Sequence, residues 1–121
     1  MIVDSSRWRP LGKGRIAPPG SITDNVLAAR LSTYKKNVAS SYRSVSPDEI
    51  HRLVPPGRHL LSTKIDGECW FLLARDGQAS LLSPSGRGIT NIPVTDEAAR
   101  ILGRRNVLLA GELYAVNGAS R

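Results

Sequence analysis

A lysine at the end of an apolar run is the residue of this chain best suited to covalent chemistry. Lys64 closes the run that starts at residue 60, and an Asp-Gly pair, Asp66 and Gly67, follows one residue later. A strand that ends there would hold the amine beside a carboxylate and between hydrophobic walls. A lysine amine that is partly removed from water can lose its proton and act as a nucleophile. The pattern therefore predicts a reactive amine at position 64.

A carboxylate and a guanidinium extend this constellation. Glu112 follows the apolar run 107–110, and a carboxylate that ends a buried strand needs a partner such as a ribose hydroxyl or a cation. Arg87 lies in a glycine-flanked loop, where the backbone can approach a phosphate and the planar guanidinium can grip it. Taken singly, each residue has an ordinary explanation: a surface lysine beside a turn, a glutamate that reaches solvent, an exposed loop arginine.

Hydrophobic periodicity predicts the elements that must position these residues. We expect an α+β fold, in which helices flank a twisted and mainly antiparallel sheet. The expected helices lie near residues 23–36, 46–53 and 95–102, and the expected strands span residues 60–65, 69–74, 79–83 and 107–114.

Turn and capping residues sharpen these expectations. The Asp-Gly pair at 76–77 joins two apolar runs, which is typical of a β-hairpin. Ser21 or Thr23 is a candidate N-cap for the first helix, and residues 46–49 have the pattern of a capping box. Residues 107–110 are expected to form a buried, central strand.

Charge and composition narrow the class of protein. The chain has 121 residues and a net charge of +7, from 17 Lys and Arg against 10 Asp and Glu, which favours a polyanionic partner such as nucleic acid. Residues 1–20 are basic and turn-rich and are interpreted as an irregular arm. Cys69 is the single cysteine, which excludes an internal disulfide. We see neither a membrane-length apolar run nor a signal peptide, so we expect a cytoplasmic protein without a membrane partner.

Three segments, in order, resemble the covalent nucleotidyltransferase superfamily of ATP-dependent DNA ligases, RNA ligases and mRNA capping enzymes. Thr-Lys-Ile-Asp-Gly at 63–67 resembles its motif I, Ser-Gly-Arg-Gly at 85–88 its motif Ia, and Ala-Gly-Glu-Leu-Tyr at 110–114 its motif III. The resemblance covers about residues 60–114. It implies that residues 21–121 are the N-terminal part of an adenylation domain, a partial nucleotidyltransferase of ATP-grasp-like fold.

The resemblance implies an ATP-dependent polynucleotide ligase that uses ATP and Mg²⁺ in nucleic-acid repair. In the family, a lysine attacks the α-phosphate of ATP and forms lysyl-AMP. The AMP passes to the 5′-phosphate of a nicked or broken strand, and a 3′-hydroxyl then displaces it. Lys64 would be the nucleophile, and Asp66 and Gly67 would shape the turn that holds it.

The resemblance also implies roles for four further residues. Glu112 would contact the ribose or help to position the metal, and Arg87 would hold ribose or phosphate. Ser62 and Thr63 would lie near the edge of the adenine. Cys69 stands where ligases that act on DNA often carry an arginine, so DNA and RNA both stay open as substrates.

The family's later motifs have no counterpart among these residues. They include an aromatic that stacks on adenine, a glutamate for metal and a pair of lysines for the triphosphate. We therefore expect that a complementary C-terminal chain or a further domain supplies them, and that the 121 residues alone do not complete adenylylation. Two alternatives are a small basic nucleic-acid-binding protein with an incidental Lys-x-Asp-Gly turn, and a fragment of a capping-type guanylyltransferase.

Overall fold

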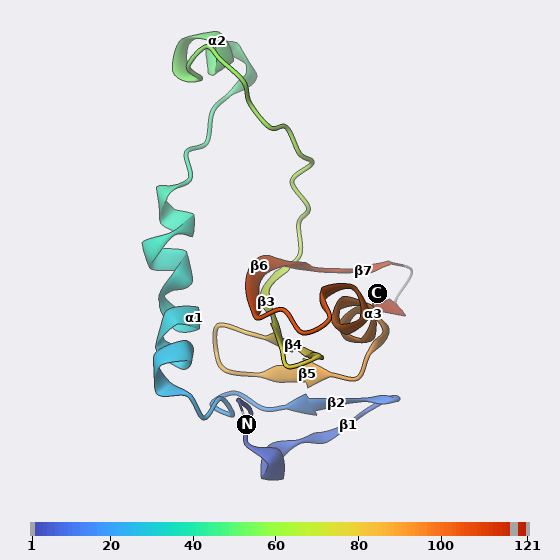
Figure 1. Ribbon diagram of the computed structural model, residues 1–121. Helices are drawn as coiled ribbons and strands as arrows, with labels where there is room; N and C mark the ends of the chain where they lie inside the picture. Colours follow the sequence, from blue (N-terminus) through green and yellow to red (C-terminus); the bar gives the residue numbers. More distant parts are fainter. Residues whose placement is uncertain (1, 117–118, 121) are drawn as a thin grey trace.

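The computed structural model describes residues 2–116 and 119–120 and has an α+β fold around a six-stranded antiparallel sheet of order β1-β2-β5-β4-β3-β6 (Figure 1). The strands of this sheet are β1 (Arg9–Leu11), β2 (Gly14–Ala17), β3 (Glu68–Arg75), β4 (Gln78–Leu82), β5 (Gly88–Thr90) and β6 (Val107–Leu113). A separate pair is formed by β7 (Ala115–Val116) and β8 (Ala119–Ser120). The α-helices are α1 (Asn25–Asn37), α2 (Ile50–Leu53) and α3 (Pro93–Leu102), and short 3-10 turns are η1 (Ser5–Arg7), η2 (Ala39–Ser41) and η3 (Pro47–Glu49). The expected α+β class with a mainly antiparallel sheet is confirmed.

The hairpin predicted around the second Asp-Gly pair is confirmed. Strands β3 and β4 pair antiparallel up to Arg75 and Gln78, which lie directly opposite each other. Asp76 and Gly77 both have positive φ, at 54° and 80°. A two-residue turn of this kind matches the right-handed twist of the strands that it joins.

The first helix lies where the sequence placed it, although its cap is different. The carboxylate of Asp24 accepts hydrogen bonds from the backbone N–H groups of Val26 and Leu27, so Asp24, rather than Ser21 or Thr23, is the N-cap. Helix α3 also lies near its expected position. The hydroxyl of Thr95 accepts from the N–H of Ile92 and so closes the start of that helix.

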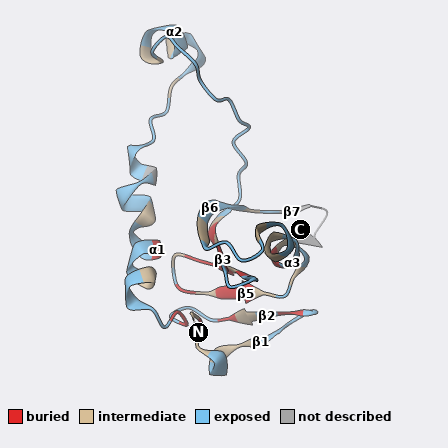
Figure 2. Ribbon diagram, in the orientation of Figure 1, coloured by how far each residue is buried: buried red, intermediate tan, exposed pale blue. Residues whose placement is uncertain are grey.

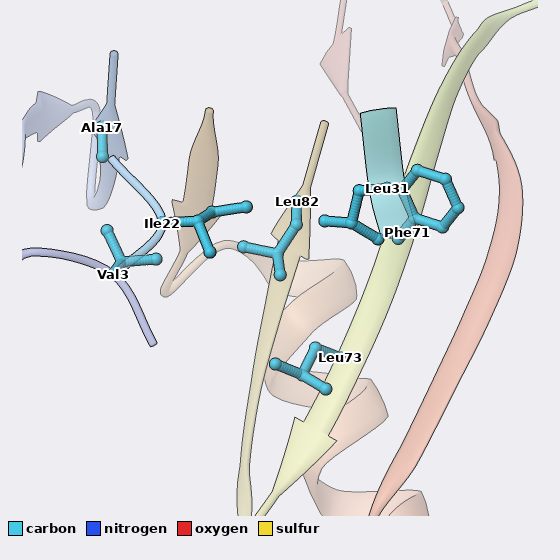
Figure 3. Packing of buried hydrophobic residues seen from close by; sticks show 7 residues of the cluster. All are labelled: Val3, Ala17, Ile22, Leu31, Phe71, Leu73 and Leu82. Carbon is cyan, nitrogen blue, oxygen red and sulfur yellow. The ribbon is translucent and has the colours of Figure 1, made fainter. Parts of the chain in front are cut away.

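The two helices α1 and α3 cover opposite faces of the sheet. On one face, Leu31 of α1 packs with Phe71, and the same cluster extends to the N-terminal strands (Figure 3). On the other face, Val94 of α3 packs against a cluster that contains Trp70. Phe71 and Trp70 are neighbours in β3, and successive residues of a strand point to opposite faces. Strand β3 is therefore the centre of both halves of the core.

Residues 1–20 are not an irregular arm, as their composition had indicated. Strands β1 and β2 form a hairpin at the edge of the sheet, and β2 pairs with β5. Ala17 and Val3 are buried. The pairing partner, Ile89 opposite Ile16, is distant in sequence, so the local pattern of glycine and proline could not reveal it.

The segment between α1 and β3 projects from the sheet and is largely exposed (Figures 1 and 2). The strand expected over residues 60–65 is absent: residues 60–66 have no regular structure. Leu60 and Leu61 are fully exposed, at 104% and 100%. An apolar run becomes a strand only where a neighbouring strand accepts its hydrogen bonds. The short helix expected near 46–53 is present as η3 and α2, but Ser46 makes no side-chain cap, so the capping box is wrong.

Strand β6 is an edge strand rather than the buried, central strand that its apolar residues predicted. Within the described residues it pairs with β3 alone. Leu109 is half exposed, and residues 110–112 are exposed. Among the described residues, the sheet therefore has an open edge at β6. None of the helices in the described residues is long and apolar enough to cross a membrane.

Candidate functional site

Lys64 lies in the projecting segment and is accessible to solvent. Its side chain is 90% exposed, and its Nζ lies 3.7 Å from Oδ1 of Asp66, whose side chain is fully exposed. Ser62 and Thr63 are exposed as well. The expected desolvation of the amine is therefore wrong for this structure, because the leucines at 60 and 61 that were to wall it in are themselves in water.

Gly67 connects this segment to β3 and packs against the end of β6. A Cβ atom on Gly67 would lie 2.5 Å from the carbonyl oxygen of Leu113, a distance that no side chain could occupy without moving the backbone. Its φ is not positive. The glycine is thus required for the close approach of two segments of the chain, rather than for the tight turn expected from the Asp-Gly sequence.

Glu112 lies beside the start of β3. It pairs with Cys69 across the β3–β6 ladder, and directly opposed residues in an antiparallel pair share one face of the sheet. Burial raises the pKa of the Cys69 thiol, and the nearby charge of Glu112 raises it further. Glu112 itself is exposed. The structure therefore brings the segments around Gly67 and Glu112 together at one end of the sheet.

Arg87 lies on the opposite face from Glu112. Its guanidinium forms an ion pair with Glu68 and stacks over the ring of Trp70, 4.8 Å from its centroid. Because Glu68 and Trp70 alternate with Cys69 along β3, their side chains point away from the face that carries Glu112. The structure does not bring Arg87 to the Glu112 side of the sheet.

The loop of Arg87 is also closed on itself. The Arg87 N–H donates to Oγ of Ser83 at 3.0 Å, and the Ser83 N–H donates to the Arg87 carbonyl at 3.0 Å. A Cβ on Gly86 would lie 3.0 Å from the backbone nitrogen of Gly20. The glycine-lined backbone that was expected to approach a phosphate instead packs against the chain at residues 20–21.

Glu68 and Trp70 form a polar cluster that the sequence reasoning missed. The indole N–H of Trp70 and the guanidinium of Arg87 hold the pKa of Glu68 below its usual range. The contact between the buried indole nitrogen and Glu68 lies outside the geometry of an ordinary hydrogen bond. Strand alternation was the available indication, because it places residues 68 and 70 on one face.

A groove lies on the Glu112 face of the sheet, between α1 and β6. Its volume is about 430 Å³, and Leu108 and Ala110 of β6 line one side, opposite Arg30, Tyr34 and Asn37 of α1. Leu108 and Ala110 alternate with Glu112 along β6 and therefore share its face. A larger cavity, of about 550 Å³, lies at the far end of the sheet beside the 76–77 turn and contains none of the predicted site residues.

The donor set is compatible with a cation that arrives with a nucleotide. Within the described residues, no group of three or more His, Cys, Asp or Glu side chains could hold a metal ion. Mg²⁺ is commonly bound by one or two carboxylates together with substrate phosphates. Glu112, exposed at the edge of the sheet, fits the role of such a single carboxylate ligand.

Comparisons of this chain with protein-family models, with curated proteins and with solved structures found no match. Its function is therefore inferred from its own residues.

Proposed function

We propose that this chain is a nucleotidyltransferase module of an ATP-dependent polynucleotide ligase, with a partial nucleotidyltransferase (ATP-grasp-like) fold, that acts in the cytoplasm on nicked or broken strand ends of DNA or RNA. One observation supports this most. Gly67 packs against the carbonyl of Leu113, and Glu112 lies opposite Cys69. Two segments that resemble motifs I and III of one family thus meet at one end of β3 and β6.

In the proposed reaction, the Lys64 amine attacks the α-phosphorus of ATP. A P–N bond forms, the P–O bond to the β-phosphate breaks, pyrophosphate leaves with the bonding electrons, and the amine proton passes to solvent. A 5′-phosphate oxygen of the nucleic acid then displaces the lysine and takes the AMP, which a 3′-hydroxyl finally expels. Mg²⁺ bound to the phosphates would stabilise charge on the leaving pyrophosphate, with Glu112 as its protein ligand.

We propose further that the chain needs an additional segment or partner chain to complete adenylylation. Attack requires an uncharged amine, which enzymes obtain through desolvation or neighbouring cations. Lys64 is 90% exposed, and within the described residues its ionic partner is the carboxylate of Asp66. A complementary chain that covers this end of the sheet would supply the missing desolvation.

Nucleotide binding tests the proposed site. In a titration of ¹⁵N-labelled protein with ATP and Mg²⁺, we expect amide shifts at Lys64, Gly67 and Glu112, and none at Gly77 in the distant hairpin turn. Lys64→Ala should weaken the shifts, whereas Lys13→Ala, an exposed lysine in the β1–β2 turn, should not. Shifts that are absent, or that gather at the hairpin turn, would overturn the proposed site.

Covalent labelling tests the proposed dependence on a partner. After incubation with ATP labelled at the α-phosphate and Mg²⁺, we expect only trace, acid-labile label, which Lys64→Ala abolishes. Near-stoichiometric labelling would confirm the reaction and contradict the need for a partner.

A second candidate is a small basic nucleic-acid-binding protein in which the Lys-x-Asp-Gly turn is incidental. The exposed pair of Lys64 and Asp66 favours it, because a surface lysine beside a turn has this environment. Oligonucleotide binding together with an absence of ATP shifts would select this candidate. Shifts and label with GTP in place of ATP would select a capping-type guanylyltransferase instead.

A further inference from the structure

Helix α1 and the segment after it carry positive charge in a stretch of sequence without acidic residues. The sequence has no Asp or Glu between Asp24 and Asp48. The cations in this interval are Arg30, Lys35, Lys36 and Arg43, and all of them are exposed. Within the described residues, none of these four has a carboxylate partner, whereas Arg52, Lys64, Arg87 and Arg100 each have one.

An exposed aromatic ring lies among these cations. Tyr42 is 72% exposed, which is unusual for a ring that could otherwise join the core. The other candidates for base stacking are less available, since Trp70 and Phe71 are buried and Arg15 covers the ring of Trp8. Tyr42 is therefore the most exposed Tyr, Trp or Phe ring of the described residues. Tyr114 follows it, with 47% of its surface exposed.

Tyr42 is exposed but lies beside Tyr34, which packs on the core. The nearby side chain of Tyr42 raises the pKa of Tyr34, with a smaller contribution from burial. The ring of Tyr34 meets that of Phe71 edge to face, with centroids 5.2 Å apart. Side-chain hydroxyls of Ser40 and Ser41 bond back to carbonyls of α1 and of the residue that caps it. A ring held in this way loses little freedom when a planar group stacks on it.

The same surface is continuous with the end of the sheet that carries the proposed site. The charge of Lys35 acts on both Glu68 and Cys69, and on Cys69 it opposes the rise in pKa that burial causes. These residues begin β3, directly after Gly67. Figures 1 and 2 show that the exposed segment after α1 extends away from the sheet and returns to it at the start of β3.

We propose that Lys35, Lys36, Tyr42 and Arg43, here called the α1 surface, bind single-stranded nucleic acid and lead an unpaired strand toward Lys64. Cations contact the phosphates of such a strand, and its unstacked bases stack on aromatic rings. A duplex would keep its bases stacked internally and make no use of Tyr42. This inference deepens the proposed function by stating where its polynucleotide substrate lies and that it is unpaired there.

Fluorescence anisotropy with labelled oligonucleotides tests the role of the ring. The probes are oligo(dT) and oligo(U) of about 20 nucleotides, a length within the range of one or two single-strand sites, and a duplex of equal length. We expect both single strands to bind more tightly than the duplex. Tyr42→Leu should weaken single-strand binding about tenfold at an unchanged salt dependence, and Tyr42→Phe, which keeps the ring, should bind within about twofold of wild type.

A matched pair of double variants tests the role of the charge. Lys35→Ala/Lys36→Ala should reduce the slope of log K against log salt by about 1.4, because each phosphate contact of a single strand contributes about 0.7. Arg104→Ala/Arg105→Ala removes the same charge from exposed residues between α3 and β6, at the end of β6 away from Glu112. This control should leave the slope unchanged.

Four results would overturn the proposal: no binding at low salt, equal affinity for duplex and single strands, no effect of Tyr42→Leu, or equal effects of the two double variants. The measurement contains no ATP or Mg²⁺. If the oligonucleotides do not bind but ATP still shifts the amide of Lys64, the role of the α1 surface is wrong and the proposed function stands. If the oligonucleotides bind as expected but ATP causes no shifts, AMP transfer is wrong and the role of the α1 surface stands.

Discussion

The chain contains two Asp-Gly pairs close together, and the structure uses them in different ways. At 76–77 both residues have positive φ, and a Cβ on Gly77 would meet no atom within 4 Å. At 66–67 neither φ is positive, and a Cβ on Gly67 would collide with the carbonyl of Leu113. The first glycine is required by backbone conformation, and the second by the approach of another chain segment.

The flanking residues account for this difference. The 76–77 turn joins two strands that pair directly and bury Leu73 and Ala79. Among the described residues, no strand pairs with the run before the 66–67 pair, and Leu60 and Leu61 remain in water. A turn dipeptide produces a hairpin only when both flanking runs can pair and bury a face. The same Asp-Gly dipeptide therefore does not predict the same structure at both places.

The largest expected effect concerns the apolar residues on the two sides of this comparison. Leu82→Ala, in the hairpin, should lower the free energy of unfolding by about 3 kcal/mol, because Leu82 is fully buried and its truncation leaves a cavity. Leu61→Ala should change it by less than about 0.5 kcal/mol. Urea unfolding followed by circular dichroism measures both. A substantial loss for Leu61→Ala would mean that the Lys64 segment packs in solution.

Alanine at Gly67 should have the next largest effect. Its Cβ would lie 2.5 Å from the carbonyl oxygen of Leu113, so β3 and β6 must separate, at a cost of about 2 kcal/mol. Gly111→Ala on β6 is the matched control, because its Cβ would meet no atom within 4 Å. The same urea titration compares the two, and equal stability of the two variants would contradict the close approach.

Alanine at Gly77 should cost less than alanine at Gly67. The added methyl group has open space, so the penalty is confined to the positive φ of 80° and amounts to about 1 kcal/mol. Thermal and urea unfolding provide the measurement. If Gly77→Ala were the more damaging of the two, the assignment of conformation to one glycine and of contact to the other would be reversed.

The smallest expected effect is the pH dependence contributed by Glu68, which directly follows the 66–67 pair. Trp70 and Arg87 lower its pKa in the folded state, so its ionised form favours folding. That contribution is present above the unfolded pKa of about 4.3 and is lost as pH falls through the lower, folded pKa. Between about pH 7 and pH 3, wild type should therefore lose more melting temperature than Glu68→Gln. Parallel curves of melting temperature against pH would show that the ion pair with Arg87 adds nothing.

The candidate site was predictable in part. Gly67 and Glu112 were expected at one site from their sequence segments, and they do lie at one end of β3 and β6. By contrast, Lys64 is exposed rather than buried, and Arg87 lies on the face opposite to Glu112. The burial of Lys64 depends on what covers the projecting segment. The sheet face of a side chain depends on how its strand is paired with its neighbours, and the sequence of a single segment does not reveal that pairing.

The exposed ring of Tyr42 was also beyond the sequence. The sequence around the two tyrosines does not indicate that Tyr34 packs against Phe71 while Tyr42 stays exposed. Trp70 and Phe71, by contrast, are both buried. Amphipathic spacing indicates which residues can be buried, but a core of limited volume determines which of them are.

The sequence by itself determined the local structure: the hairpin at 76–77, the positions of α1 and α3, and the acid-free positive interval along α1. These depend on interactions within a few residues, such as turn conformation, capping and helical periodicity. Tertiary structure alone decided that residues 9–17 join the sheet, that residues 60–66 do not, and that Arg87 and Glu112 lie on opposite faces. A strand exists only through its neighbour, and the neighbour is chosen by the packing of segments that are far apart in the chain.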